Sequence, residues 1–130
     1  MSNSATALPD LAAIRAAQRR IAPYVHRTPV LHSRSLDALA AAELYFKCEN
    51  FQKVGAFKAR GACNAVFALD AATAAQGVVT HSSGNHGAAL AYAARERGIA
   101  AYVVMPDNAP KIKIDNVRGF GATIRFCAPN

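Results

Sequence analysis

The alternation of strand-like and helix-like segments after Gly77 is the feature that most constrains the fold of this chain. Three short apolar runs alternate with two longer helix-like stretches, and in chain order the segments are 78–80, 86–97, 100–105, 111–117 and 123–127. Glycines stand where the helices are expected to end, with Gly98 after the first stretch and Gly119 or Gly121 after the second. Strands that alternate with helices of this length indicate right-handed βαβ units, so an α/β structure with a parallel sheet is predicted.

The first half of the chain has a less regular pattern. Its predicted elements are a helix that Asp10 caps and that carries Leu11, Ile14, Gln18 and Ile21 on one side, an extended segment at 28–31, a helix at 35–42, a strand at 43–49 and a helix at about 56–69. Thr28 is expected to be extended because the residue before a proline avoids the helical region. The strand is predicted from the apolar residues Leu44, Phe46 and Cys48 at alternate positions. The last helix places Lys58 in its first turn.

Composition and charge exclude several classes of protein. The net charge is +7, but the basic residues are scattered rather than gathered into a tract with aromatic residues, so no nucleic-acid partner is expected. No apolar run approaches the roughly 20 residues that span a bilayer, and the N-terminus does not read as an export signal. The three cysteines have no metal-ligand spacing, and Cys48 and Cys63 are expected to be small buried residues. We therefore expect a cytoplasmic protein with no membrane contact and no metal site.

Lys58 has small or flat residues within one helical turn of it. They are Gly55, Ala56, Phe57, Ala59, Gly61 and Ala62. A bulky planar group can therefore approach the ammonium of Lys58 without steric conflict, which is typical of a lysine that forms a Schiff base. The alternative is a solvent-exposed lysine on an ordinary helix, because lysine is mostly exposed in proteins.

The segment 82–86 lies between a predicted strand and the start of a predicted helix. Free backbone N–H groups and the positive end of the helix dipole bind anions at such a place, and hydroxyl and amide side chains add donors. The alternative is an ordinary capped helix with Ser83 or Asn85 as its N-cap. His81 and His86 have no acidic or cysteine partner at a suitable spacing, so neither is expected to bind a metal.

Five ordered segments resemble a known family. They are 26–31, 46–52, 55–62, 79–87 and 105–111. These segments resemble the fold-type II enzymes that use pyridoxal phosphate (PLP), in particular the group of serine/threonine dehydratases and serine racemases. Several motifs in one order are more specific than a lone glycine pattern. Many members of the group have serine two residues before the Schiff-base lysine, where this chain has Ala56.

The resemblance implies a role for each site residue. Lys58 would hold PLP as a Schiff base and would be the base that removes the Cα proton of the substrate. Asn85 would contact the ring hydroxyl of the cofactor, and Ser83 could deliver a proton to the substrate face opposite the lysine, as in racemase-like members. The residues implied to bind the substrate, chiefly through its carboxylate, are Ser82, Ser83, Gly84, Asn85 and His86.

Dehydration is the activity that these motifs favour. Loss of the β-hydroxyl group from L-serine or L-threonine would give a 2-oxo acid and ammonia. The alternative within the group is a serine racemase with side dehydratase activity. Two further alternatives are another β-elimination or β-replacement enzyme of the same fold, such as a cysteine or threonine synthase, and a non-catalytic phosphate-binding βαβ module that uses only the loop around Gly84.

Two other groups of polar residues give weaker signals. Racemase-like members hold a nucleotide effector between subunits, which implies ATP, Mg²⁺ and a homodimer; the matching positions here are Ser33, Arg34, Ser35 and Lys53. The alternative for these positions is a helix cap with exposed charges. Lys111 and Lys113, together with Asp115, are interpreted as a solvated helix face.

The members of the group have much longer chains, so the resemblance implies a fragment of two domains, both incomplete. Residues 1–76 are expected to be the N-terminal part of the large PLP-binding domain, and residues 77–130 a small α/β domain. The glycine-rich loop for the cofactor phosphate and the residue that faces the pyridine nitrogen are expected to lie outside this sequence. Activity is expected of the full-length enzyme rather than of the fragment alone.

Overall fold

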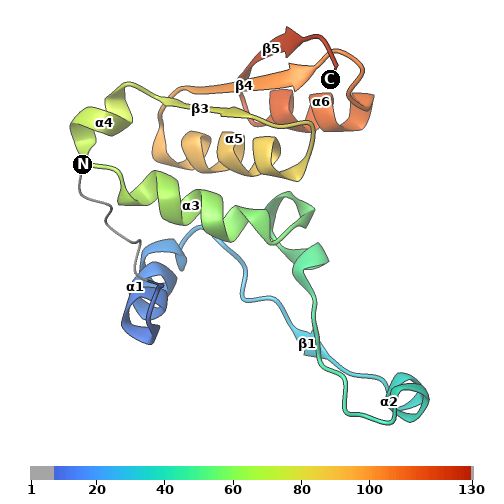
Figure 1. The fold of residues 1–130 in the computed structure, drawn as a ribbon. Helices are drawn as coiled ribbons and strands as arrows, with labels where there is room; N and C mark the ends of the chain where they lie inside the picture. Colours follow the sequence, from blue (N-terminus) through green and yellow to red (C-terminus); the bar gives the residue numbers. More distant parts are fainter. Residues whose placement is uncertain (1–7, 130) are drawn as a thin grey trace.

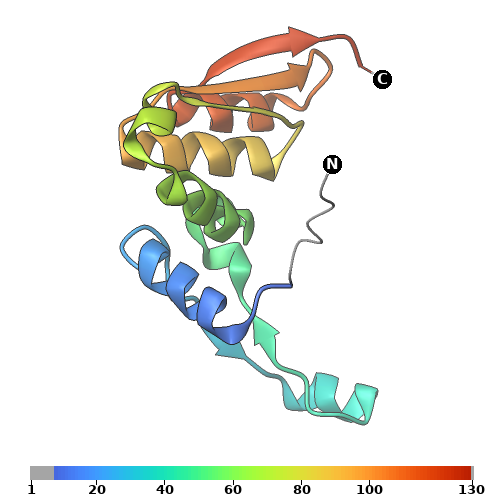
Figure 2. The ribbon, with the colours of Figure 1, turned by 60° about the vertical axis from the view of Figure 1, so that its left-hand side comes forward.

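The computed structural model describes residues 8–129. The second half of the chain contains a three-stranded parallel sheet. Its strands, in spatial order, are β3 (Val78–His81), β4 (Ala101–Pro106) and β5 (Thr123–Cys127). Val78 lies opposite Ala101, and Tyr102 lies opposite Thr123. The helices α5 (Asn85–Arg97) and α6 (Lys111–Gly119) connect successive strands and cover one face of the sheet (Figure 1 and Figure 2). The predicted βαβ architecture is confirmed.

The first half of the chain is more extended. Its elements are α1 (Leu11–Ile21), β1 (Val30–Leu31), α2 (Arg34–Ala40), β2 (Phe46–Lys47), the 3₁₀ turns η1 (Glu49–Phe51) and η2 (Lys53–Gly55), α3 (Lys58–Ala68) and α4 (Ala71–Ala75). The strands β1 and β2 pair antiparallel, and together with α2 they form an arm that projects from the rest of the molecule (Figure 1). Helix α3 brings the chain back, because it packs against α5.

The strand predicted at 43–49 is wrong in extent, because only β2 pairs with another strand. On its N-terminal side, the backbone N–H of Leu44 donates to Asp37 Oδ1 at 2.8 Å, which closes the turn after α2. On its C-terminal side, Glu49 begins a 3₁₀ turn and its carboxylate binds Arg60. Side-chain hydrogen bonds of Asp37 and Glu49 therefore occupy the two ends of the segment for which alternation predicted a strand.

Most of the predicted helix ends are confirmed. The Asp10 carboxylate caps α1 by accepting the N–H of the third helical residue at 2.7 Å. Gly98 ends α5 in the left-handed region with φ of 73°. After α6, Gly121 rather than Gly119 adopts a positive φ, of 82°. The short helix α4, capped by Asp70, is an element that the sequence analysis did not predict.

Helix α5 lies at the centre of the core. Every residue from 87 to 94 is buried, because α5 packs with α3 on one side and with β4 and α6 on the other. Small residues permit this packing: a Cβ at Gly87 would lie 3.0 Å from Cγ1 of Val103. Cys63 is buried in this core as expected, and burial raises its pKa to about 11. Cys48 is only half-buried.

The apolar stripe predicted for α1 is only partly covered. Ile21 is buried against α3 and α5, whereas Leu11 and Ile14 remain 59% and 56% exposed. Within residues 8–129, no helix has the length and apolar character needed to cross a membrane.

Candidate active site

The helices α3, α5 and α6 begin at the same end of the molecule, where the three strands also end (Figure 1). In a parallel sheet the first turns of the connecting helices present unpaired N–H groups at this edge, and ligands of open α/β sheets bind there. Lys58 is the first residue of α3, and the loop 82–84 leads into α5. The fold therefore brings the two predicted motifs to one end of the molecule.

The amine of Lys58 is available to a ligand. The side chain is exposed, and its Nζ lies 5.2 Å from the centroid of the Phe57 ring. Within residues 8–129, Nζ makes no hydrogen bond and no ion pair with another side chain. An amine that is not bound to protein groups, beside the flat face of an aromatic ring, can accept a planar partner.

The turn before Lys58 has an unusual backbone. Val54 has φ of 57° and Gly55 has φ of 67°, so two successive residues are in the left-handed region. For the β-branched Val54 this conformation costs on the order of 1–3 kcal/mol. The Val54 side chain packs against both hydrophobic clusters of the core, which offsets that cost. The turn sets the direction in which α3, and with it Lys58, begins.

Gln52 fixes the same turn from the other side. Its side chain is 4% exposed and accepts the backbone N–H groups of His26 at 2.8 Å and Lys53 at 2.9 Å. Its amide nitrogen donates to the carbonyl oxygen of His26, also at 2.8 Å. One buried amide thus binds the segment around His26 to the loop that leads to Lys58. The sequence analysis did not identify this residue, because nothing local marks a glutamine as buried.

An ion pair between Glu49 and Arg60 holds the start of α3. The guanidinium of Arg60 donates to both carboxylate oxygens, from Nε at 2.8 Å and from an Nη at 2.7 Å. The buried Thr28 hydroxyl also donates to Glu49, and Lys47 donates to the Thr28 carbonyl at 2.6 Å. The hydrogen bonds from Arg60 hold the pKa of Glu49 at about 2, although burial opposes this shift. The same bond raises the pKa of Arg60. We call Gln52, Thr28, Glu49 and Arg60 the lysine anchor.

Ser82 shapes the second motif. Its Oγ accepts the backbone N–H groups of Gly84 and Gly87, each at 3.1 Å. The N-cap residue of α5 is Gly84, so the alternative that Ser83 or Asn85 caps the helix is wrong. Ser82, two residues before Gly84, performs the capping, because the backbone folds its hydroxyl over the first turn. Its two acceptor positions are used, and its own hydroxyl proton is left for a further partner.

The remaining loop residues are open to solvent. Ser83, Asn85 and His86 are exposed, and the Ser83 hydroxyl makes no hydrogen bond within residues 8–129. Asn85 accepts a hydrogen bond at its Oδ1 from Lys113 Nζ, at 2.6 Å. The interpretation of 111–115 as a solvated helix face is confirmed for the Lys111 and Asp115 pair. Lys113 is half-buried, and its ammonium makes an exposed hydrogen bond to the neighbouring helix.

The four residues predicted to hold a nucleotide effector do not meet within one chain. Ser33, Arg34 and Ser35 are at the start of α2, at the far end of the arm (Figure 1 and Figure 2). Lys53 is in η2, which packs against α5.

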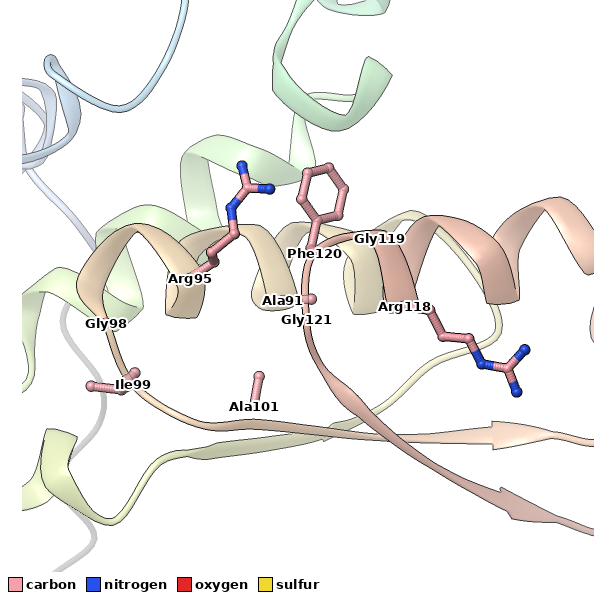
Figure 3. A pocket seen from close by; sticks show the side chains of 9 residues that line it. All are labelled: Ala91, Arg95, Gly98, Ile99, Ala101, Arg118, Gly119, Phe120 and Gly121. Carbon is pink, nitrogen blue, oxygen red and sulfur yellow. The ribbon is translucent and has the colours of Figure 1, made fainter.

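Figure 3 shows a cavity at the opposite end of α5 and α6. It has a volume of about 400 Å³ and is lined by Ala91, Arg95, Gly98, Ile99, Ala101, Arg118, Gly119, Phe120 and Gly121. The Arg95 guanidinium lies over the Phe120 ring at 4.9 Å, whereas Arg118 points away from both. Carbonyl groups rather than N–H groups are free where helices end, and neither motif lines this cavity. We therefore place the candidate active site at the Lys58 end.

Comparisons with known proteins match most of the chain. The sequence model of a family described as pyridoxal-phosphate dependent enzyme matches residues 21–130. A serine racemase of Oryza sativa subsp. indica is 63% identical over 115 residues, which cover 88% of this chain and 34% of the rice protein. A beta-hydroxyaspartate dehydratase of Paracoccus denitrificans is 54% identical over 123 residues, which cover 95% of this chain and 39% of that protein.

A solved structure, that of maize serine racemase, is similar in fold as well. It has a TM-score of 0.90 and 57% sequence identity, over 93% of this chain and 37% of the maize chain. The fold class predicted from the resemblance is confirmed. The chain spans between about a third and two fifths of the length of the curated relatives described here.

Proposed function

This chain belongs to the pyridoxal-phosphate dependent enzyme family, and on that premise we propose that it carries the catalytic lysine of a β-hydroxy-α-amino acid dehydratase. One observation carries the proposal. Lys58, the first residue of α3, lies at the same end of the molecule as the loop 82–84, which leads into α5. L-Serine and L-threonine are the proposed substrates, and a 2-oxo acid and ammonia the products. The similarity to a protein named beta-hydroxyaspartate dehydratase supports this reaction class.

The side chains at this end fit PLP. When bound, PLP supplies a conjugated ring that accepts the electrons of the Cα–H bond. The exposed amine of Lys58 is free to bind an aldehyde covalently and, as a base, to take up the Cα proton of a substrate. The amide nitrogen of Asn85 has no partner within residues 8–129, because Lys113 binds only the amide oxygen, and it can donate to a ring oxygen.

The loop offers donors for the substrate carboxylate. The Ser82 hydroxyl accepts two backbone N–H groups and retains its own proton, so it can donate to an anion. Ser83 adds a hydroxyl that has no partner among the described residues, and Gly84 and His86 add the backbone of the first turn of α5, whose dipole favours negative charge. In the overall reaction the β-hydroxyl leaves as water, and hydrolysis of the remaining unsaturated amine releases ammonia and the 2-oxo acid.

Serine racemase activity is the second candidate, and the exposed hydroxyl of Ser83 favours it. Its hydroxyl is exposed and without a partner in the described part of the chain, so it can serve as an acid or base on the side of the substrate away from Lys58. The relatives from rice and maize that carry the name serine racemase support this alternative.

We also propose how the site is completed. Residues 1–76 belong to a large cofactor domain and residues 77–130 to a small domain of a longer, cytoplasmic, homodimeric enzyme. ATP with Mg²⁺ is the proposed effector, bound by Ser33, Arg34, Ser35 and Lys53. The distance of α2 from η2 in one chain supports a site that two subunits share.

The test uses the protein that carries this sequence, purified with PLP. We expect a yellow absorption that borohydride bleaches, and 2-oxo acid release from L-serine or L-threonine. An absence of borohydride-sensitive absorption would contradict the proposed function and leave the non-catalytic phosphate-binding module as the alternative. If L-serine and D-serine interconvert faster than 2-oxo acid appears, serine racemase replaces dehydratase as the main activity.

A further inference from the structure

The first turn of α6 contains two lysines whose surroundings differ. Cations are disfavoured at the start of a helix, where the dipole is positive. Lys111 is compensated by an ion pair with Asp115 one turn later, and its side chain is 88% exposed. Lys113 is half-buried, and within residues 8–129 it has no carboxylate at ion-pair distance. Its contact is Oδ1 of Asn85, at 2.6 Å on the neighbouring helix.

This contact determines which way the Asn85 amide faces. A lysine ammonium has donors and no acceptor, so it can bind only the oxygen of an amide. The two N–H donors of Asn85 are then left free, because the amide nitrogen has no partner within the described residues. Without Lys113, the amide could turn over and present its oxygen instead.

We propose that Lys113 is a positioning residue that holds Asn85 as a donor toward the bound ligand. The inference rests on the proposed function, in which Asn85 contacts a ring oxygen of PLP. A hydrogen bond to a charged oxygen is stronger than one to a neutral oxygen. An Asn85 that can only donate therefore favours the anionic form of the ring oxygen. The contact also connects the first turn of α5 to the first turn of α6, at the edge of the sheet where the substrate is proposed to bind.

The experiment compares the PLP-loaded protein that carries this sequence with Lys113→Met, Lys113→Arg and the matched control Lys111→Met. The absorption spectrum at saturating PLP reports the protonation of the ring oxygen and is independent of turnover. We expect Lys113→Met to lose yellow absorption in favour of near-ultraviolet absorption, and its kcat to fall roughly tenfold, as loss of a hydrogen bond to a charged group predicts. Lys113→Arg should retain the wild-type spectrum, and so should Lys111→Met.

A double-mutant cycle tests whether Lys113 acts through Asn85. In an Asn85→Ala background, Lys113→Met should change neither the spectrum nor kcat further. Additive losses would overturn the inference, since they would mean that Lys113 acts independently of Asn85. The inference is also overturned if Lys113→Met has the spectrum of Lys111→Met.

These outcomes are distinct from a failure of the proposed function. If the wild-type protein has no borohydride-sensitive absorption, the proposed function fails, and the inference fails with it. If the wild type shows that absorption and Lys113→Met leaves it unchanged, only the role of Lys113 is wrong. Thermal unfolding of each variant distinguishes a misplaced Asn85 amide from a destabilised protein. For the inference to stand, Lys113→Arg must match the wild type in both absorption spectrum and Tm.

Discussion

The segment that carries Lys58 and the loop 82–86 lie at the same end of the molecule but are held in different ways. The lysine anchor joins residues far apart in the sequence, such as Glu49 with Arg60 and His26 with Gln52, through partly buried charged and amide groups. The loop is shaped mainly by its own first turn, through the Ser82 hydroxyl. In the described part of the chain, its hydrogen bond to a distant side chain is the one from Lys113. The lysine is therefore positioned by tertiary structure, and the loop mostly by local helix capping.

Replacement of Lys58 by alanine is expected to have the largest effect. Covalent attachment of PLP and nearly all turnover should be lost, because one amine serves as both the attachment point and the base. The comparison predicts that Asn85→Ala, on the loop, retains covalent attachment and loses only part of the turnover. Borohydride reduction followed by mass spectrometry of the peptide with Lys58 measures the first effect. Substantial ammonia release from Lys58→Ala would contradict the assignment.

Ser83→Ala should have a large effect on one reaction only. Interconversion of L- and D-serine should fall by about 10²-fold or more, the contribution of a general acid or base, while elimination from L-serine is largely retained. Elimination from D-serine should fall with the interconversion. Deuterium exchange at Cα for each isomer, with 2-oxo acid release measured in parallel, gives the ratio. Equal losses for both isomers would mean that Ser83 only binds the carboxylate.

Glu49→Gln tests the lysine anchor. Loss of the charged hydrogen bonds to Arg60 should lower the free energy of unfolding by about 2 kcal/mol at pH 7. The folded-state pKa of Glu49, about 2, lies below its ordinary value of 4.5, so this stabilisation is present above pH 4.5 and is lost as the pH falls toward 2. Urea unfolding at several pH values should show that dependence in the wild type and less of it in the variant. Glu96→Gln, which removes an exposed pair with Arg95, is the control and should change stability little.

Ser82→Ala should have the smallest effect on the free energy of unfolding among the stabilising groups considered. Removal of the capping oxygen is expected to cost about 1 kcal/mol of stability, and it should speed amide exchange at Gly84 and Gly87. Ser83→Ala is the control for stability, because the Ser83 hydroxyl makes no hydrogen bond in the part of the chain that the structure describes. Equal Tm values for the two variants would show that the loop does not depend on local capping.

Much of the fold could be predicted because its signals are local. The alternation of strands and helices, the cap at Asp10 and the position of Lys58 in the first turn of α3 all depend on residues close in sequence. The predicted strand at 43–49 was wrong in extent because Glu49 begins a 3₁₀ turn, in which its carboxylate accepts hydrogen bonds from Arg60, eleven residues away. Periodicity contains no information about such a partner.

The sequence by itself determined the parallel α/β fold and the two motifs, because propensity, capping and hydrophobic period act within a few residues. Only the tertiary structure decided what holds those motifs in place. The burial of Gln52, the left-handed turn at Val54 and the bond from Lys113 to Asn85 each depend on a partner from another element. The cost of burying or straining such groups is offset only when distant segments pack together, and that packing is a property of the folded chain.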